Sequence, residues 1–239
     1  MSIPVVCVSS RNPTEWYYRL DTFLKSAKRL DFTPIVLGMD VPWQGLMTKP
    51  NLFRKWLRES NGAPNQRAIL TDCWDVIFSH HPDSISAKCQ SLFGDAVVFN
   101  TERACWPHPE LAVHFPDEGT PWRYLNGGVM CGTIGNLLGM FEGMDLESIG
   151  VDRKNDDGTW HYPNDATPLV NAFVNQKVPV KVDARCQVFQ SFSASSLDEF
   201  EITSTGVRNK LTDTWPGILH FNGDAKNEIM PKIMAEMNL

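Results

Sequence analysis

The feature that most constrains this chain is the stretch from Arg67 to Ser79, which reads RAILTDCWDVIFS. Two short apolar runs flank a polar segment in which Asp72 and Asp75 are spaced i, i+3. A short apolar run between polar residues predicts a buried strand, and ligands bind beyond the carboxyl ends of strands in open α/β sheets. The two carboxylates are therefore candidate ligands for a hard cation and its phosphate partner. The alternative is a pair of solvated turn aspartates.

The residues before this stretch predict alternating strands and helices. Apolar runs predict strands at Val5–Ser9, Pro34–Leu37 and Arg67–Thr71. A first helix is expected to begin at Asn12-Pro13, and a second is expected at Lys49–Glu59. This strand–helix–strand–helix–strand order predicts a parallel sheet with helices on its faces.

The remaining residues extend the same α/β pattern. Further strands are expected at Ala96–Asn100, Val178–Val182 and Cys186–Phe189, and a helix is expected to start at Asn164-Asp165. No repeat, low-complexity tract or linker divides the 239 residues, a length that suits one large α/β domain. We therefore expect a single Rossmann-like domain over residues 1–239, with a mostly parallel central sheet flanked by helices.

Composition narrows the class of protein further. The chain is 42% hydrophobic and 21% charged, which is ordinary globular composition. It contains no apolar run long enough to cross a membrane and no signal peptide at its start. The six cysteines include no CxxC pair, so reduced cysteines and a cytoplasmic location are expected. The net charge of −6 argues against a globally basic nucleic-acid binder, although it allows a local basic patch.

Two polar clusters in the second half of the chain each allow a structural or a functional interpretation. Asn126, Gly127 and Gly128 follow an apolar pair, which favours a structural turn, with close approach to a ligand as the alternative. An acidic patch surrounds the aromatic residues at 160–162, and such patches are typical of solvated loops. Its members are Asp152, Asp156, Asp157 and Asp165.

A third cluster stands near the end of the chain. His220, Asn222 and Lys226 follow the short apolar run that starts at Ile218. A hydrogen-bonded structural histidine and a surface lysine are the alternatives to a ligand set at this position.

Together these segments resemble the glycosyltransferase domain of the procollagen lysyl hydroxylase family, a nucleotide-sugar-dependent domain of the GT-A type. The similar segments follow the family order and cover nearly the whole chain. They are TDCWDVIF, VVFNTERACWPHPELA, RYLNGGVMCG, NDATPLVNAF, ARCQVFQ and DTWPGILHFNG, followed by Lys226. Two features depart from the family: a Gly-rich segment before the DxxD motif is missing, and the aspartate run is reduced to Asn164-Asp165.

The resemblance implies a role for each candidate residue. Asp72, Asp75 and His220 would hold a divalent cation, and an oxygen-plus-imidazole site suits Mn²⁺ better than Mg²⁺. Trp74, at the family's Tyr position, would stack on uracil. The expected catalytic residues are Asp165, Lys226 and Trp106. The expected contacts of the UDP-sugar donor are Asp72, Trp74, Lys49, Asn126, Gly127, Asn222, Gly223 and Lys226.

The implied function is metal-dependent transfer of a sugar from a UDP-sugar to a hydroxyl group. The leading acceptor is a hydroxylated or hydroxymethylated pyrimidine in DNA, as expected for compact bacteriophage relatives. Arg54, Lys55 and Arg58 would then meet phosphates, or else form a solvated helix face. The alternatives are hydroxylysine or another protein hydroxyl, and a non-catalytic sugar-nucleotide or carbohydrate-binding module. Residues 1–80 would form the nucleotide-binding half, and 81–239 the acceptor half with a closing C-terminal segment.

Overall fold

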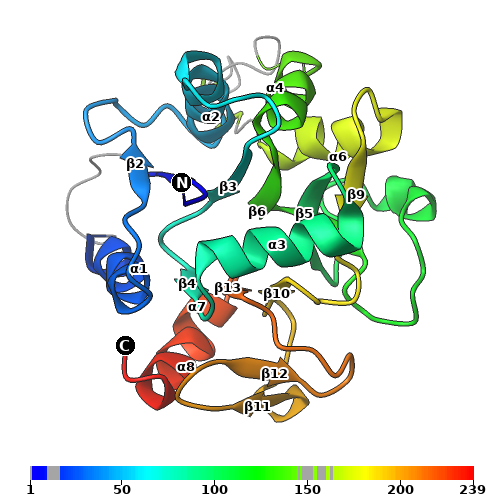
Figure 1. Cartoon of the computed structure of the whole chain (residues 1–239). Helices are drawn as coiled ribbons and strands as arrows, with labels where there is room; N and C mark the ends of the chain where they lie inside the picture. Colours follow the sequence, from blue (N-terminus) through cyan, green and yellow to red (C-terminus); the bar gives the residue numbers. More distant parts are fainter. Residues whose placement is uncertain (1, 10–16, 145, 147–152, 155–159, 162–163) are drawn as a thin grey trace.

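The centre of the computed structural model is a six-stranded sheet with the strand order β2-β1-β3-β6-β5-β9 (Figure 1). The structure describes all residues except 1, 10–16, 145, 147–152, 155–159 and 162–163. The strands of this sheet are β1 (Val5–Val8), β2 (Ile35–Leu37), β3 (Arg67–Thr71), β5 (Val97–Glu102), β6 (Tyr124–Thr133) and β9 (Val180–Val182). β6 runs antiparallel to β3 and β5, while the other neighbouring pairs are parallel. The expected mostly parallel central sheet is confirmed.

Helices cover both faces of this sheet. They are α1 (Tyr17–Arg29), α2 (Thr48–Glu59), α3 (Pro82–Phe93), α4 (Ile134–Glu142) and α6 (Ala166–Asn175). Two shorter helices, α7 (Ala225–Glu228) and α8 (Met230–Glu236), follow near the C-terminus. On one face α2, α4 and α6 contribute Phe53, Leu137 and Leu169 to a single core cluster. On the other face α1 and α3 contribute Phe23 and Ile85 to a second cluster. Among the described helices, none has the length and apolar character that a bilayer crossing requires.

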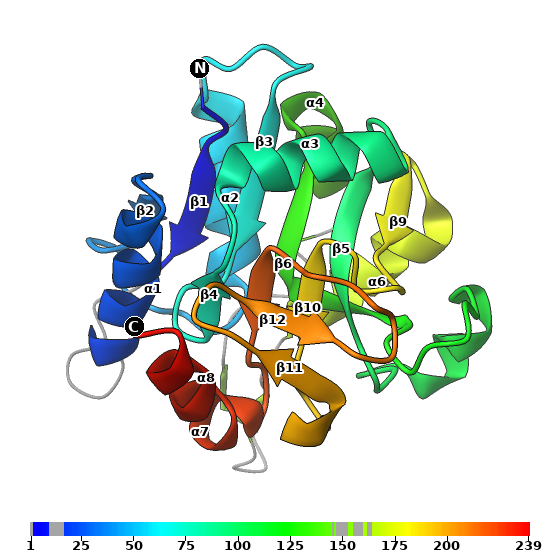
Figure 2. The same ribbon diagram turned by 60° about the horizontal axis from the view of Figure 1, so that its bottom comes forward.

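A second, smaller sheet lies beside the carboxyl end of β3. Its strands, in the order β10-β13-β4, are β10 (Phe189–Ser191), β13 (Ile218–His220) and β4 (Val76–Phe78). Figure 2 shows this sheet beneath the main one, together with the hairpin of β11 (Phe200–Ile202) and β12 (Val207–Asn209). Ile77, Leu219 and Phe221 pack here with residues of α7 and α8, so the C-terminal helices close over the small sheet.

The reading of Asn126, Gly127 and Gly128 as a turn is wrong, because all three lie inside the ten-residue strand β6. The register between β5 and β6 shifts next to Asn100, so part of this segment has no direct partner in β5. The close contact that glycine permits here is made with another side chain of the protein. A Cβ on Gly127 would lie 2.5 Å from Leu169 Cδ1.

Other sequence-based expectations are met with shifted boundaries or fall outside the described residues. The strand expected at Cys186–Phe189 begins only at Phe189, because the residues before it form a turn. Asn12-Pro13 lies outside the described residues, and so does most of the acidic patch around residues 152–162. In that patch only two short paired strands are described, β7 (Arg153–Lys154) and β8 (Trp160–His161).

The turn before β10 is held by Asp183, a carboxylate that is 1% exposed. Its Oδ1 accepts a hydrogen bond from the Gln187 amide at 2.9 Å. Its Oδ2 accepts bonds from the amides of Val188 at 2.7 Å and Phe189 at 2.9 Å. Burial raises the pKa of Asp183, and these three amides offset part of that rise. The side chain therefore fixes where β10 begins, and with it the strand β13 that pairs with β10.

We expect Asp183→Ala to destabilise the protein by about 3 kcal/mol or more, because it leaves several buried amides without an acceptor. Urea denaturation followed by circular dichroism measures the change. Asp40 is an exposed loop aspartate, so Asp40→Ala serves as the control and should shift stability by less than about 0.5 kcal/mol. Equal stability of the two variants would contradict the role assigned to Asp183.

Candidate active site

Three candidate ligands converge where the two sheets meet. His220 Nε2 lies 3.5 Å from Asp75 Oδ1 and 3.8 Å from Asp72 Oδ2. One donor atom from each of the three residues falls within 4.8 Å of the others. The histidine side chain is only 3% exposed, whereas Asp72 and Asp75 keep 28% and 17% exposure. The arrangement presents two carboxylates and one imidazole nitrogen to a single point, a donor set that suits a divalent cation.

Strand pairing explains how residues so far apart in the sequence meet. Asp72 directly follows β3, and its amide donates to the carbonyl of Gly128 at 2.7 Å. In the small sheet, His220 pairs with Val76, and the amide of Phe221 donates to the carbonyl of Asp75 at 2.7 Å. The antiparallel register of β4 and β13 therefore places the imidazole next to the DxxD segment.

Gly128 makes room for the imidazole. A Cβ at this position would lie 2.1 Å from His220 Cε1, well inside van der Waals contact. The Nδ1 atom of His220 lies 3.1 Å from Asn100 Nδ2, so this contact holds the ring with Nε2 toward the carboxylates. The glycine at position 128 thus shapes the site without contributing a side chain.

The charges of the cluster influence one another. Burial lowers the pKa of His220, but attraction to Asp75 and Asp72 outweighs burial and raises it above the ordinary value. Burial alone would raise the pKa of Asp75, yet the positive charges of His220 and Lys226 contribute to a net lowering. The cluster therefore favours the ionised form of Asp75, which is the form that binds a cation.

Lys49 links two of the candidate carboxylates. Its Nζ lies 2.8 Å from Asp72 Oδ1 and 2.7 Å from Asp165 Oδ2. Burial disfavours the ammonium form, but attraction to Asp165 and Asp72 raises the pKa of Lys49 above its ordinary value. Asp165 is 9% exposed and precedes the first residue of α6. A fixed positive charge therefore stands between the DxxD segment and the start of this helix.

A pocket of about 240 Å³ opens beside the cluster. Its lining residues are Val8, Trp43, Leu46, Lys49, Asp72, Cys73, Trp74, Asp75 and Lys226. Trp74 donates its indole N–H to Ser9 Oγ at 3.2 Å, and its ring centroid lies 6.2 Å from that of Trp43. One end of the pocket is thus aromatic and apolar, while the other carries the carboxylates and two lysines.

The structure places several other candidate residues outside this lining. The amides of Asn126 and Asn222 donate to the two carboxylate oxygens of Glu102, at 3.1 and 2.9 Å. Asn222 Oδ1 also accepts a bond from Ser191 Oγ at 2.5 Å. Burial raises the pKa of Glu102, and the two amides partly offset it. This polar network lies beside His220 and ties β5, β6 and β10 to the segment after β13.

Trp106, Gly127 and Gly223 are not brought to the pocket either. Trp106 is 54% exposed in the loop after β5, and among the described residues it is not part of the pocket lining. Gly223 is exposed with φ of +64°, a left-handed conformation that favours glycine.

Sequence reasoning missed Trp43, Glu102 and Asn100. Trp43 and Glu102 follow the predicted strands Pro34–Leu37 and Ala96–Asn100, so the rule that sites form at strand carboxyl ends could have identified both. Asn100 lies within its strand and carries no such signal.

Comparison with solved structures identifies the fold. The crystal structure of the galactosyltransferase LgtC in complex with donor and acceptor sugar analogs aligns over 99% of this chain and 95% of that chain. The TM-score is 0.53 and the identity is 12%, which supports a shared GT-A fold.

A family model described as the PLOD GT domain matches residues 2–232, and the chain therefore belongs to that glycosyltransferase family. The procollagen-lysine,2-oxoglutarate 5-dioxygenase of Drosophila melanogaster is 26% identical over 234 residues, covering 91% of this chain and 30% of the relative. The human multifunctional procollagen lysine hydroxylase and glycosyltransferase LH3 is 27% identical over 231 residues, covering 90% and 29%. The chain thus spans about 30% of the length of these relatives.

We expect Gly128→Ala to displace the His220 ring and to lower Mn²⁺ affinity by about tenfold or more, because the added methyl overlaps the imidazole. Isothermal titration calorimetry with Mn²⁺ measures the affinity. Gly206→Ala is the matched control, since a Cβ there would meet its nearest neighbour at an ordinary 3.5 Å. Unchanged Mn²⁺ affinity in Gly128→Ala would contradict the proposed position of the imidazole in the site.

Proposed function

We propose that this domain transfers a sugar from a UDP-sugar to a hydroxyl acceptor, with a divalent cation held by Asp72, Asp75 and His220. The observation that carries this proposal is the convergence of these three side chains beside a pocket with an aromatic end and a cationic end. A nucleoside diphosphate has the same polarity, since a flat base lies at one end and negative charge at the other.

The donor set fits a divalent cation by its chemistry. Two carboxylates with one imidazole nitrogen suit Mn²⁺, and a harder Mg²⁺ would rely more on the oxygens. A bound cation would offset the negative charge that develops on the departing diphosphate. Mn²⁺ is therefore the proposed cation.

Different residues of the chain would bind different parts of the donor. Trp74 and Trp43 offer aromatic faces for uracil at the apolar end of the pocket. Lys226, at the other end, would interact with the diphosphate, and its fixed charge is most useful as the sugar–phosphate bond breaks. In this scheme residues 1–80 supply most donor contacts, and the C-terminal segment returns to complete them.

The acceptor is open to two proposals. The first is a hydroxylated pyrimidine in DNA, for which the basic side chains of α2 would contact phosphates. Of these, Arg58 makes a bidentate ion pair with Glu142 at 2.5 and 2.7 Å, and Arg54 donates to Asn51. A protein hydroxyl, such as hydroxylysine, is the second candidate, and the similarity to procollagen lysine hydroxylases favours it.

A non-catalytic sugar-nucleotide or carbohydrate-binding module remains the rival to an enzyme. Incubation with UDP-glucose or UDP-galactose and Mn²⁺ separates the two, because many transferases slowly hydrolyse their donor when the acceptor is missing. We expect release of UDP that depends on Mn²⁺. Tight UDP binding without any release would favour the binding module.

We expect Asp75→Asn to keep the fold and to lower Mn²⁺-dependent UDP release by more than about a hundredfold, because a neutral amide is a poorer ligand for a hard cation. UDP release and thermal melting are measured on the same preparation. The exposed turn residue Asp31, with φ of 57°, provides the control Asp31→Asn, since asparagine tolerates that conformation. Near-normal turnover by Asp75→Asn would remove this residue from the metal site.

We expect Lys226→Ala to lower kcat for UDP release by about a hundredfold to a thousandfold, or roughly 2.7–4 kcal/mol in the barrier. The Kd for the UDP-sugar should rise only modestly, because the charge is needed most in the transition state. Calorimetry measures donor binding separately from turnover. Lys232→Ala, at an exposed lysine of α8, is the control. An unchanged kcat in Lys226→Ala would contradict the role of Lys226 at the leaving group.

A further inference from the structure

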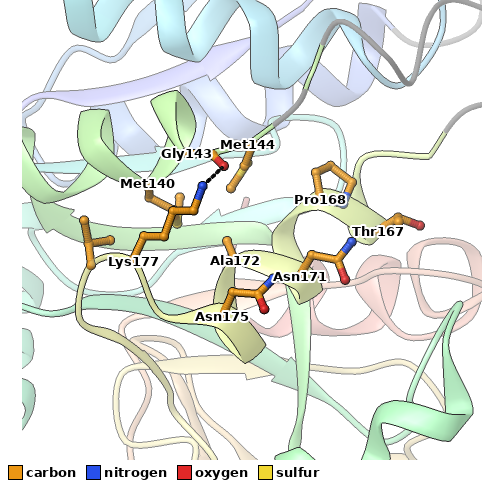
Figure 3. Close-up of a pocket in the computed structure, with 10 residues that line it drawn as sticks. Met140, Gly143, Met144, Thr167, Pro168, Asn171, Ala172, Asn175 and Lys177 are labelled. Carbon is orange, nitrogen blue, oxygen red and sulfur yellow. Dashed lines mark hydrogen bonds between the residues drawn. The ribbon is translucent and has the colours of Figure 1, made fainter.

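A second pocket, of about 300 Å³, lies between α4 and α6 (Figure 3) and shares no described lining residue with the pocket beside the carboxylate cluster. Its lining residues are Met140, Gly143, Met144, Thr167, Pro168, Asn171, Ala172, Asn175, Lys177 and Val178. Met140 and Met144 are buried and offer an adaptable apolar surface. The pocket therefore combines an apolar floor with a polar rim, which is the usual composition of a binding site.

The polar rim is formed mainly by one side of α6. Asn171 and Asn175 are exposed, and neither side-chain amide makes a hydrogen bond within the described part of the chain. Figure 3 shows both amides on the same helix, across the pocket from Met140 and Met144. Each amide offers donors and an acceptor together, so each can pair with both the N–H and the C=O of a peptide backbone.

The spacing of the two amides matches an extended polypeptide. Residues i and i+4 of a helix are separated by about 6 Å along its axis. Every second residue of an extended chain repeats at about 6.6–6.8 Å. Asn171 and Asn175 can therefore bond alternate residues of one extended segment, while a side chain between them enters the apolar floor.

The charge of the pocket is poorly suited to a nucleic acid. Affinity for DNA depends on Lys and Arg at several phosphates, whereas Lys177 is the single such residue in the described lining. The Nζ of Lys177 donates to the carbonyl of Gly143 at 3.3 Å, as the dashed line in Figure 3 marks. Neutral hydrogen-bonding groups and methionines fit a polypeptide better.

The lining of the pocket begins close to the carboxylates in the sequence, at the start of α6. Asp165, which pairs with Lys49, stands directly before α6. Thr167 lines the pocket two residues later, and its hydroxyl contacts both Asn164 and His108 at 3.0 Å. Measured from Asp165 along the helix axis, Asn171 and Asn175 lie at about 9 and 15 Å. A polymer whose hydroxyl reaches the cluster can thus continue along α6.

We propose that the pocket between α4 and α6 binds an extended polypeptide segment of the acceptor, about three to five residues from the hydroxyl-bearing residue. This proposal rests on the proposed transferase function, because only a transferase has an acceptor. The binding step itself is independent of catalysis and can be measured alone.

The test uses a fluorescein-labelled peptide of about twelve residues, long enough to reach the pocket on either side of one central hydroxylysine. Leucine and serine alternate in its flanks. Its Kd is measured by fluorescence anisotropy for the wild-type protein and for Asn171→Ala/Asn175→Ala. The matched control is Asn61→Ala/Asn65→Ala, because those two asparagines are also exposed and four residues apart. Release of UDP from a UDP-sugar is measured for all three proteins.

The Asn171→Ala/Asn175→Ala variant should bind the peptide about ten- to a hundredfold more weakly, the loss of two neutral hydrogen bonds. The control and the release of UDP should not change, and free hydroxylysine should be glycosylated equally by all three proteins. Equal peptide binding by both variants would overturn the proposal. So would binding of a hydroxymethylcytosine oligonucleotide that depends on the same two asparagines in place of the peptide. If the wild-type protein binds the peptide but releases no UDP, the transferase function fails and the peptide site stands.

Discussion

The antiparallel pairing of β13 with β4 is the interaction on which the site depends. This pairing sets His220 opposite Val76 and joins Phe221 to the carbonyl of Asp75. Without it, the DxxD segment would be a loop at the end of β3 with no imidazole within reach. The ring fits only because residue 128 has no side chain. One backbone register and one glycine thus determine the geometry of three ligands from distant parts of the chain.

The pairing of β13 with β4 gathers carboxylates whose negative charge other groups must compensate. Asp72, Asp75 and Asp165 bring three carboxylates to a partly buried region, and the positive charges near them include Lys49, Lys226 and protonated His220. Burying carboxylates without compensating charge is costly. Lys49 offsets the charge by pairing with two carboxylates at once. A divalent cation bound to neutral His220 would take the place of the imidazolium charge beside Asp72 and Asp75.

Features that depend on residues close together in the sequence could be predicted, whereas features that depend on contacts between distant segments could not. The order of strands and helices up to β3 could be predicted, because local apolar runs determine it. The DxxD segment and the residues after β13 stood out as polar residues at strand ends. The glycines in β6 suggested a turn because glycine is rare within strands, and only the neighbours Leu169 and His220 explain them. The network around Glu102 joins four separate segments, so no local pattern could reveal it.

The position of Lys49 also bears on Asp165, which the sequence suggested as a catalytic residue. Its Oδ2 lies 2.7 Å from Lys49 Nζ and the residue is only 9% exposed, so the carboxylate contributes a buried ion pair whatever its part in catalysis. In this arrangement Asp165 holds Lys49 in place against Asp72. It also fixes the start of α6 relative to the DxxD segment. Lys49, which lines the pocket beside the cluster, is therefore linked through Asp165 to the helix that lines the α4–α6 pocket.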